Sequence, residues 1–329
     1  MEKGRKRSAV LVGCNYEGTQ YELRGCINDV RAMREALVGR FGFEEGRIEV
    51  LTDAPGSPAM PTGANIRAAL GRMVDRAEPG DVLFFHYSGH GTRIPSPRPS
   101  FPFKKDEAIV PCDFNLITDV DFRHLVNRLP KGATFTIFSD SCHSGGLIDK
   151  EKEQVGPSSA PTPRGGGDAS LSSAAPTKHI PFEALLQHLS SLTHIATPDI
   201  GTHLLESFGA EASLRFRLPQ LEAAPSSGPL KPDEGILLSG CQANETSADM
   251  NPSAEGEKAY GAFSNAVQTV LRENDRRLSN REVVVLAREV LRKQRFEQHP
   301  CLYCSDENAD GSFLGQHDED DDEEDGVPC

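Results

Sequence analysis

The chain has 329 residues, of which 37% are hydrophobic and 26% charged, and its formal net charge is −14. That length can bury a sizeable core, in one large domain or two small ones. The acidic balance argues against nucleic-acid binding, and no apolar run approaches the roughly 18 residues that cross a bilayer. The basic start, Met1 to Arg7, precedes too short an apolar stretch for a secretory signal. We therefore expect neither nucleic acid nor a membrane as a partner.

The first 142 residues alternate strands with helices. Short apolar runs predict buried strands at residues 9–14, 47–51, 82–87 and 133–138. A periodic helix is expected after Asn28 and Asp29 as its cap, and another after Thr62. This alternation indicates an α/β fold with a mostly parallel central sheet and helices on both faces.

The composition changes after residue 155. Residues 156–178 are rich in Ser, Pro, Gly, Ala and Thr, as is typical of a linker or an exposed loop. A weak helical pattern follows at 182–192, a strand at 235–241, and helices near Phe263 and after the capping box of Ser279 and Glu282. The eight acidic residues 318–325 are typical of a solvated, disordered tail.

Eight scattered cysteines are too sparse for a disulfide scaffold and favour a reducing compartment, where each thiol fills the core, binds a metal or acts as a nucleophile. Cys301 and Cys304 have zinc-knuckle spacing, but no second pair exists at similar spacing. Their alternation with Leu302 and Tyr303 favours a half-buried strand, and we expect no metal there.

Two of the predicted parallel strands end in residues that could perform chemistry together. His90 follows one strand and Cys142 the other, at the edge where ligands bind in such sheets. The imidazole could take the thiol proton and later protonate a leaving amine, with the N–H groups of Gly91 and Cys142 as donors to an oxyanion. A buried cysteine and a structural histidine are the alternative. His86, within its strand, and His143, beside the cysteine, compete by residue type.

Seven segments of the chain resemble motifs of the metacaspases, which are caspase-like cysteine peptidases of plants, fungi and protists. The two segments that resemble the catalytic signatures are His86–Gly91 and Asp140–Gly146. The others are Leu11–Tyr16, Gly25–Asp29, Asp106–Asp113, Gly240–Asp249 and Ala259–Ser264. The start close to the first strand and the long insertion before the second half resemble type II metacaspases, especially the short metacaspase-nine subgroup.

This resemblance implies a caspase-like fold, with His90 as general base and acid and Cys142 as the nucleophile. It also implies a substrate-binding S1 pocket formed by Asp29 and Asp140, with Cys26 on its wall. Two carboxylates in one concave site attract Arg or Lys at P1 and repel Asp. Asp29 can also act as a charge at a helix N-terminus, and the two roles can coexist.

The resemblance also divides the chain. It implies a large catalytic subunit at 1–155, a largely flexible linker and processing region at 156–233, and a small subunit at 234–315, before the acidic tail at 316–329. The expected activity is that of a cysteine endopeptidase, made as a zymogen that cleaves itself in the linker. The family implies a role in programmed cell death or in stress and wound responses.

Two other interpretations remain open at this point. One is a catalytically silent adaptor, against which the intact His90, Cys142, Asp29 and Asp140 count. The other is a different caspase-clan enzyme, of legumain-like or Asp-specific type, which the acidic pocket and the missing signal peptide disfavour. Protein or peptide substrates, and protein protease inhibitors, are the expected partners of a monomer. The cytoplasm is the expected location, with the nucleus or unconventional release to the apoplast as alternatives.

Calcium is the one cofactor to weigh, because many metacaspases need it. Residues 92–105, after the histidine motif, contain no carboxylate, unlike the acidic cluster often found there in type II members. A second family site could correspond to Asp106, Asp119, Asp121 and Asp149, but Val120 interrupts the expected acidic run, and hard cations need several oxygen ligands. We expect calcium independence and no bound cofactor.

The self-cleavage site should have a basic P1 residue in exposed, loose backbone. Arg215 and Arg217 alternate with apolar residues as in a half-buried strand, which leaves Arg164 and Lys178. Lys178 ends the linker just before structure resumes and lies where related type II members are processed, whereas Arg164 precedes three glycines. We predict main cleavage after Lys178 and minor cleavage after Arg164.

Overall fold

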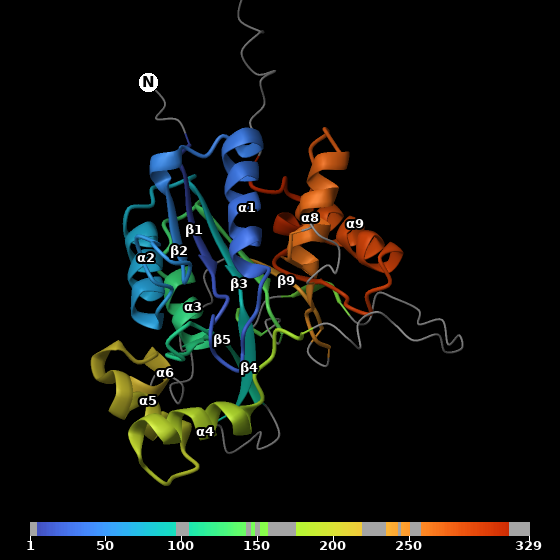
Figure 1. The fold of residues 1–329 in the computed structure, drawn as a ribbon. Coiled ribbons are helices and arrows are strands. Elements are labelled where there is room, and N and C mark those ends of the chain that lie inside the picture. The colour runs from blue at the N-terminus through green and yellow to red at the C-terminus, as the bar shows by residue number, and fades with distance from the viewer. Residues whose placement is uncertain are drawn as a thin grey trace, which may run out of the picture.

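A seven-stranded sheet forms the centre of the molecule (Figure 1). The computed structural model describes residues 5–96, 105–142, 146–148, 152–156, 176–218, 235–242, 245–250 and 258–315. The strand order is β2-β1-β3-β7-β9-β12-β8. The strands are β1 (Arg7–Gly13), β2 (Ile48–Thr52), β3 (Val82–Ser88), β7 (Thr134–Asp140), β8 (Glu153–Val155), β9 (Gly235–Ser239) and β12 (Cys301–Tyr303). Neighbours from β2 to β9 pair in parallel, while β12 is antiparallel to both β9 and β8, so the mostly parallel sheet is confirmed.

Helices cover both faces of this sheet (Figure 1). Three helices pack on one face, namely α1 (Cys26–Phe41), α8 (Ala262–Glu273) and α9 (Asn280–Lys293). Two cover the other, namely α2 (Gly63–Asp75) and α3 (Asp119–Val126). Successive side chains of a strand point to opposite faces, so Leu11 of β1 joins the first cluster and Val10 and Val12 the second. The continuous apolar runs of the sequence reflect this burial on both sides.

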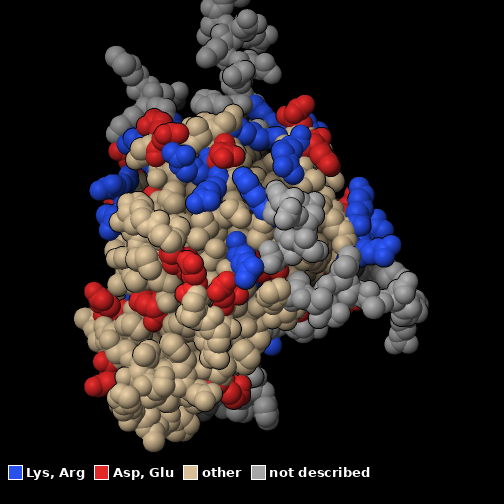
Figure 2. Space-filling model, in the orientation of Figure 1, with Lys and Arg blue, Asp and Glu red and all other residues tan. Residues whose placement is uncertain are grey.

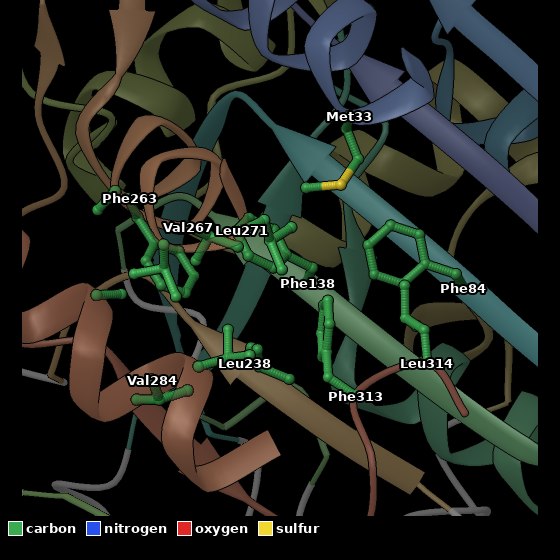
Figure 3. Close-up of a cluster of buried hydrophobic side chains, with 14 of the residues drawn as sticks. Met33, Phe84, Phe138, Leu238, Phe263, Val267, Leu271, Val284, Phe313 and Leu314 are labelled. Carbon is green, nitrogen blue, oxygen red and sulfur yellow. The ribbon is translucent and has the colours of Figure 1, made fainter. Parts of the chain in front are cut away.

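The larger core cluster lies next to the carboxyl end of β7 (Figure 3). Phe138 of β7 stacks on Phe263 of α8, with ring centroids 4.5 Å apart and planes 2° apart. Asp140 lies two residues beyond one ring and Ser264 directly follows the other. Close packing of rigid aromatic groups therefore fixes the backbone positions from which polar residues enter the site.

A second layer lies beyond the carboxyl ends of the parallel strands, on the side where β3 ends. Its elements are the antiparallel strands β4 (His90–Pro95), β5 (Lys105–Val110) and β6 (Ile117–Thr118), and the helices α4 (Phe182–Thr193), α5 (Ile200–Phe208) and α6 (Leu214–Arg217). A hydrophobic cluster that includes Ile94, Leu185 and Leu204 joins strands and helices. Residues 176–218 thus form an extended segment and three helices, within the region 156–233 that was predicted to be largely flexible. The β4–β6 sheet was not predicted from the sequence.

Two local predictions were wrong for identifiable reasons. Helix α1 begins at Cys26, with Gly25 as an N-cap that provides no side-chain hydrogen bond, and not after a cap at Asn28 and Asp29. Those two side chains instead bond the backbone of Ala259 and Gly261. Arg215 lies in the short helix α6 and not in a strand, because the Ser213 hydroxyl caps a helical turn there by accepting from the Arg215 N–H. Its buried guanidinium pairs with Asp106 at 3.0 Å.

The remaining elements are short. They are the ribbon of β10 (Asp249–Met250) and β11 (Tyr260–Gly261), the helix α10 (Asp306–Asp310), and the 3-10 turns Glu45–Arg47 and Gly209–Glu211. The capping box of Ser279 and Glu282 is present at α9. Cys301 and Cys304 are both buried thiols, and within the described ranges no group of three or more potential metal ligands occurs. None of the helices described is long and apolar enough to span a membrane.

Candidate active site around Lys178

Strands β3 and β7 bring the two candidate reactive residues to the same edge of the sheet. Ser88, at the end of β3, pairs in register with Asp140, at the end of β7. His90 and Cys142 each follow two residues later, so both leave the sheet at the same level. His86 lies inside β3 with its Nε2 3.3 Å from the Ser264 hydroxyl, and burial lowers its pKa to about 3. His143 lies outside the described residues.

The carbonyl group of Lys178 lies between these two residues. Its oxygen accepts hydrogen bonds from the backbone N–H of Gly91, at 3.0 Å, and from that of Cys142, at 3.2 Å. These are the two N–H groups expected to stabilise an oxyanion. A side chain at position 91 would overlap the Cys142 carbonyl, so only glycine allows the two donors to approach each other so closely.

The chain around Lys178 is extended and adds to two sheet edges. On the side before it, Thr177 pairs antiparallel with Ala248, and the Lys178 N–H donates to the Ser247 carbonyl at 2.9 Å. On the side after it, His179 pairs in parallel with Gly91, and the Ile180 N–H donates to the Gly91 carbonyl at 3.1 Å. An extended segment that adds to exposed edges in this way is bound as a peptide substrate would be.

The Lys178 side chain fills a closed, acidic pocket. Its ammonium nitrogen lies 2.9 Å from the Ser88 hydroxyl, 3.2 Å from Asp140 Oδ1 and 3.6 Å from Asp29 Oδ2. The lysine is 0% exposed, whereas an exposed site had been expected. It is buried because it occupies the pocket, whose wall at Gly261 would overlap the ammonium if it carried a side chain.

The two carboxylates of the pocket differ in their environment. Asp140 accepts bonds from the Ser247 hydroxyl, at 2.7 Å, and the Ser264 N–H, at 2.8 Å. Burial alone would raise the pKa of Asp140, but the Lys178 charge and these donors hold it below its ordinary value. Burial raises the pKa of Asp29 to about 7, although Lys178 and the bonds from Ser88 and Gly261 oppose that shift. Asp140 therefore carries the firmer negative charge.

Two further residues border the same pocket. Cys26 is a fully buried thiol whose pKa is raised well above its ordinary value by burial, which the Lys178 charge partly offsets. Asp249 is a third carboxylate in the field of Lys178, and it accepts bonds from the N–H groups of Arg24 and Gly25. Burial by itself would lower the pKa of Lys178, but its acidic neighbours, Asp140 above all, raise that pKa above its ordinary value. The lysine is therefore held in its charged form.

The histidine has a defined tautomer. His90 Nε2 lies 2.8 Å from the Tyr21 carbonyl, which can only accept, so the proton is assigned to Nε2. Its Nδ1 is buried without a hydrogen-bond partner in the described part of the chain and presents a lone pair. Burial lowers the His90 pKa to about 4, against the opposing effect of the Tyr21 carbonyl. Neutral imidazole with a free lone pair is the form that a general base needs.

The cysteine thiol contacts the strand that binds Lys178. Cys142 Sγ accepts a hydrogen bond from the Ser247 N–H at 2.9 Å, and the residue is 0% exposed. The geometry around Lys178 thus combines a thiol, a neutral imidazole, two oxyanion donors and an acidic pocket.

Three of the four acids considered for calcium are bonded to protein groups. Asp106 pairs with Arg215 at 3.0 Å and Asp119 with Arg123 at 2.9 Å. Asp121 accepts bonds from the Thr118 N–H, at 2.9 Å, and from the Ser213 hydroxyl, at 2.5 Å. Asp149 lies outside the described residues, as does Arg164, the second candidate cleavage site.

The polar groups that support the pocket were not predicted from the sequence. Ser88 immediately precedes Gly89 and His90, and Ser247 lies in the segment 240–249, so both stood within motifs already noted. Their hydroxyls were not singled out because serine is common at strand ends and turns. Tyr21, which orients His90, lies in a loop without a signal of its own.

Comparisons with known proteins agree with this geometry. The family model described as the caspase domain matches residues 6–310. The chain is 60% identical over 319 residues to Metacaspase-9 of Arabidopsis thaliana, covering 95% of this chain and 98% of that protein. It is 39% identical over 366 residues to Metacaspase-6 of the same plant, covering 94% and 99% of the two chains.

A solved structure supports the fold independently. A crystal structure from Geobacter sulfurreducens superposes with a TM-score of 0.58 at 19% identity, covering 93% of this chain and 97% of that one, which bears on the fold alone. The fold and the site define a caspase-domain protein with a cysteine-peptidase site. Within that class, the chain belongs to the metacaspase family of cysteine peptidases, whose substrates are proteins.

Proposed function

We propose that this metacaspase is an endopeptidase that cleaves after Lys or Arg, with Cys142 as nucleophile and His90 as base, and that it is made as a zymogen that cuts itself after Lys178. The observation that carries the proposal is the position of Lys178. Its carbonyl oxygen accepts from the N–H groups of Gly91 and Cys142, and its ammonium lies between Asp29 and Asp140. These contacts support Lys178 as a P1 residue held before cleavage.

The proposed reaction follows from these contacts. Cys142 Sγ gives its proton to His90 Nδ1 and attacks the Lys178 carbonyl carbon, and the oxyanion is held by the N–H groups of Gly91 and Cys142. The Lys178–His179 C–N bond then breaks as the imidazolium protonates the leaving amine of His179. Water hydrolyses the thioester in the same manner, which restores the thiol and releases a carboxylate at Lys178.

Specificity for basic P1 residues is supported by the charges of the pocket. Asp140, Asp29 and the Ser88 hydroxyl all accept hydrogen bonds, and a cation is the group that satisfies them together. An Asp side chain at P1, in place of Lys178, would bring a third negative charge next to the two buried carboxylates, at a cost of several kcal/mol. Arg would use the same carboxylates through its planar fork.

The catalytically silent adaptor is the second candidate, and no contact in the site favours it. The family supports a role in programmed cell death or in stress and wound responses. The expected independence of calcium is retained as part of the proposal, since Asp106, Asp119 and Asp121 have protein partners.

Fragment sequencing of the purified chain tests the proposal. Incubation should yield pieces of 178 and 151 residues, the smaller beginning at His179. Cys142→Ala should remain intact. Lys178→Ala should not be cleaved after position 178, yet it should still cleave added Lys peptides once its chain has been cleaved at another site. A fragment that starts at Gly165 would reassign the site to Arg164, and cleavage by Cys142→Ala would contradict the assignment of the nucleophile.

A further inference from the structure

The side chain of Gln298, between α9 and β12, is buried behind the site and bonded at both ends. Its Nε2 donates to the Gly240 carbonyl at 2.7 Å and to the Ser247 hydroxyl at 3.0 Å. Its Oε1 accepts from the Ala248 N–H at 3.2 Å. The opposite orientation of the amide would set oxygen against the Gly240 carbonyl, so the bonds themselves assign the two ends. Gln298 is 3% exposed.

Ser247, which this amide holds, contacts each functional part of the site. Its N–H donates to Cys142 Sγ at 2.9 Å, and its carbonyl accepts from the Lys178 N–H at 2.9 Å. Its hydroxyl donates to Asp140 Oδ1 at 2.7 Å. One residue therefore touches the thiol, the backbone of the bound segment and the acidic pocket.

The amide also determines which way the serine hydroxyl points. Because Gln298 Nε2 can only donate, the Ser247 oxygen accepts from it, and the hydroxyl proton is left to bond Asp140. A donor aimed at a buried carboxylate favours its ionised form. The Ala248 N–H, which would otherwise be an unpaired buried donor, is satisfied by the other end of the same amide.

We propose that Gln298 is a positioning residue for peptide cleavage, which fixes Ser247 and Ala248 so that one segment can orient the thiol, the substrate backbone and Asp140 together. Gln298 itself touches neither substrate nor the reacting atoms. The expected change in peptide kinetics rests on the proposed function, whereas the effect of Gln298 on the Cys142 thiol can be measured without any substrate.

Two substitutions separate this role from simple packing. Gln298→Glu keeps the shape and the acceptor but replaces the donor with a second acceptor, which turns the Ser247 hydroxyl away from Asp140. Gln298→Met keeps the length and removes both polar ends. Gln187→Glu, the same change at an exposed position of α4, is the matched control. Each variant is assayed as the full chain for melting temperature, peptide kinetics against pH, and the rate of iodoacetamide alkylation of Cys142 at one fixed pH.

We expect both Gln298 variants to fold and to raise KM for a P1-Lys peptide by about tenfold, the scale of one lost buried hydrogen bond. At one fixed pH, the rate of Cys142 alkylation should differ several-fold from that in the unsubstituted chain, because the Ser247 N–H, 2.9 Å from Cys142 Sγ, is no longer held in place. The carboxyl group introduced by Gln298→Glu regains a donor when it is protonated, and burial raises the pKa of such a carboxyl. Activity of Gln298→Glu relative to the unsubstituted chain should therefore recover from about pH 8 to about pH 5.5, and Gln298→Met should not recover.

Kinetics and alkylation within about twofold of the control in both variants would overturn the inference. Failure of both variants to fold would also overturn it, since Gln298 would then support the fold and not the site. If the unsubstituted chain cleaves neither Lys nor Arg peptides, the proposed function fails. The alkylation rates would still decide the role of Gln298 in that case.

Discussion

Lys178 and Ile180 lie two residues apart and are both 0% exposed, yet opposite surroundings hold them. Lys178 is bound by two carboxylates and a hydroxyl. Ile180 belongs to the apolar cluster between β4 and α4, and its carbonyl accepts from the Thr92 hydroxyl at 2.7 Å. Charge thus holds the segment before the candidate cleavage site, and apolar burial holds the segment after it.

Charged and uncharged residues are also distributed unevenly over the surface. Figure 2 shows mostly uncharged residues over the region of α4–α6, whereas basic and acidic residues mix over the part that contains α1 and α8. Leu192 and Leu205 are among the exposed apolar residues of that helical region. Electrostatic attraction depends on the ionisation of the groups involved and therefore on pH, whereas apolar burial does not depend on pH to the same degree. The two sides of the candidate cleavage site should therefore respond to different perturbations.

The largest effect is expected at Asp140. Asp140→Asn removes the firmer charge of the pocket and places an amide donor near either the Ser264 N–H or the ammonium. Breaking a buried ion pair costs about 3–5 kcal/mol, so kcat/KM for Lys and Arg peptides should fall by about 100-fold to a few thousand-fold. Asp75→Asn, which breaks an exposed ion pair with Arg128, is the control and should change little. Equal losses of kcat/KM in the two variants would contradict the assignment of Asp140 to the P1 pocket.

Asp29 should matter less than Asp140, and its effect should depend on pH. Its pKa of about 7 means that below neutral pH the carboxyl is already protonated, so Asp29→Asn then changes no charge. Above that pH the unsubstituted pocket gains a second negative charge that the variant cannot gain. Because this pKa applies while Lys178 occupies the pocket, the matching measurement is self-cleavage after Lys178: the rate for the unsubstituted chain, divided by that for the variant, should rise as the pH passes through about 7 and then level off. A ratio that falls as pH rises would show that the Asp29 assignment has the wrong sign.

A smaller effect on cleavage is expected on the apolar side. Ile180→Ala leaves a cavity in the cluster and should lower the free energy of unfolding by about 2–5 kcal/mol, against about 0.5–1.5 kcal/mol for Ile180→Val. Self-cleavage should slow by a few-fold at every pH, while short peptides that end at P1 are cleaved normally once the chain is processed. Leu192→Ala, at a side chain 54% exposed on α4, is the control. A pH dependence as strong as that of Asp29→Asn would contradict the comparison.

The difference between these two sides also explains what the sequence could reveal. Strands β1, β3 and β7 were predictable because their apolar runs reflect burial on both faces, and the positions of His90 and Cys142 follow from where those runs end. The burial of Lys178 was not predictable. Its partners Asp29 and Asp140 are distant in the sequence, and a lysine in a Ser- and Pro-rich stretch resembles an exposed one. The four-residue helix α6 was equally ambiguous, since Leu214 and Phe216 fit either a strand or a helical turn.

The smallest effect, an absence of change, is expected for calcium removal. Asp106 of β5 pairs with Arg215 of α6, and Asp121 of α3 accepts from Ser213, so these acids link α6 and its N-cap to β5 and α3. A calcium ion that bound both acids would have to displace these partners and would weaken the attachment of α6. Activity and melting temperature should therefore be the same with a chelator and with millimolar calcium. A strict requirement for calcium would contradict this expectation and would mean that these acids exchange their protein partners for the ion.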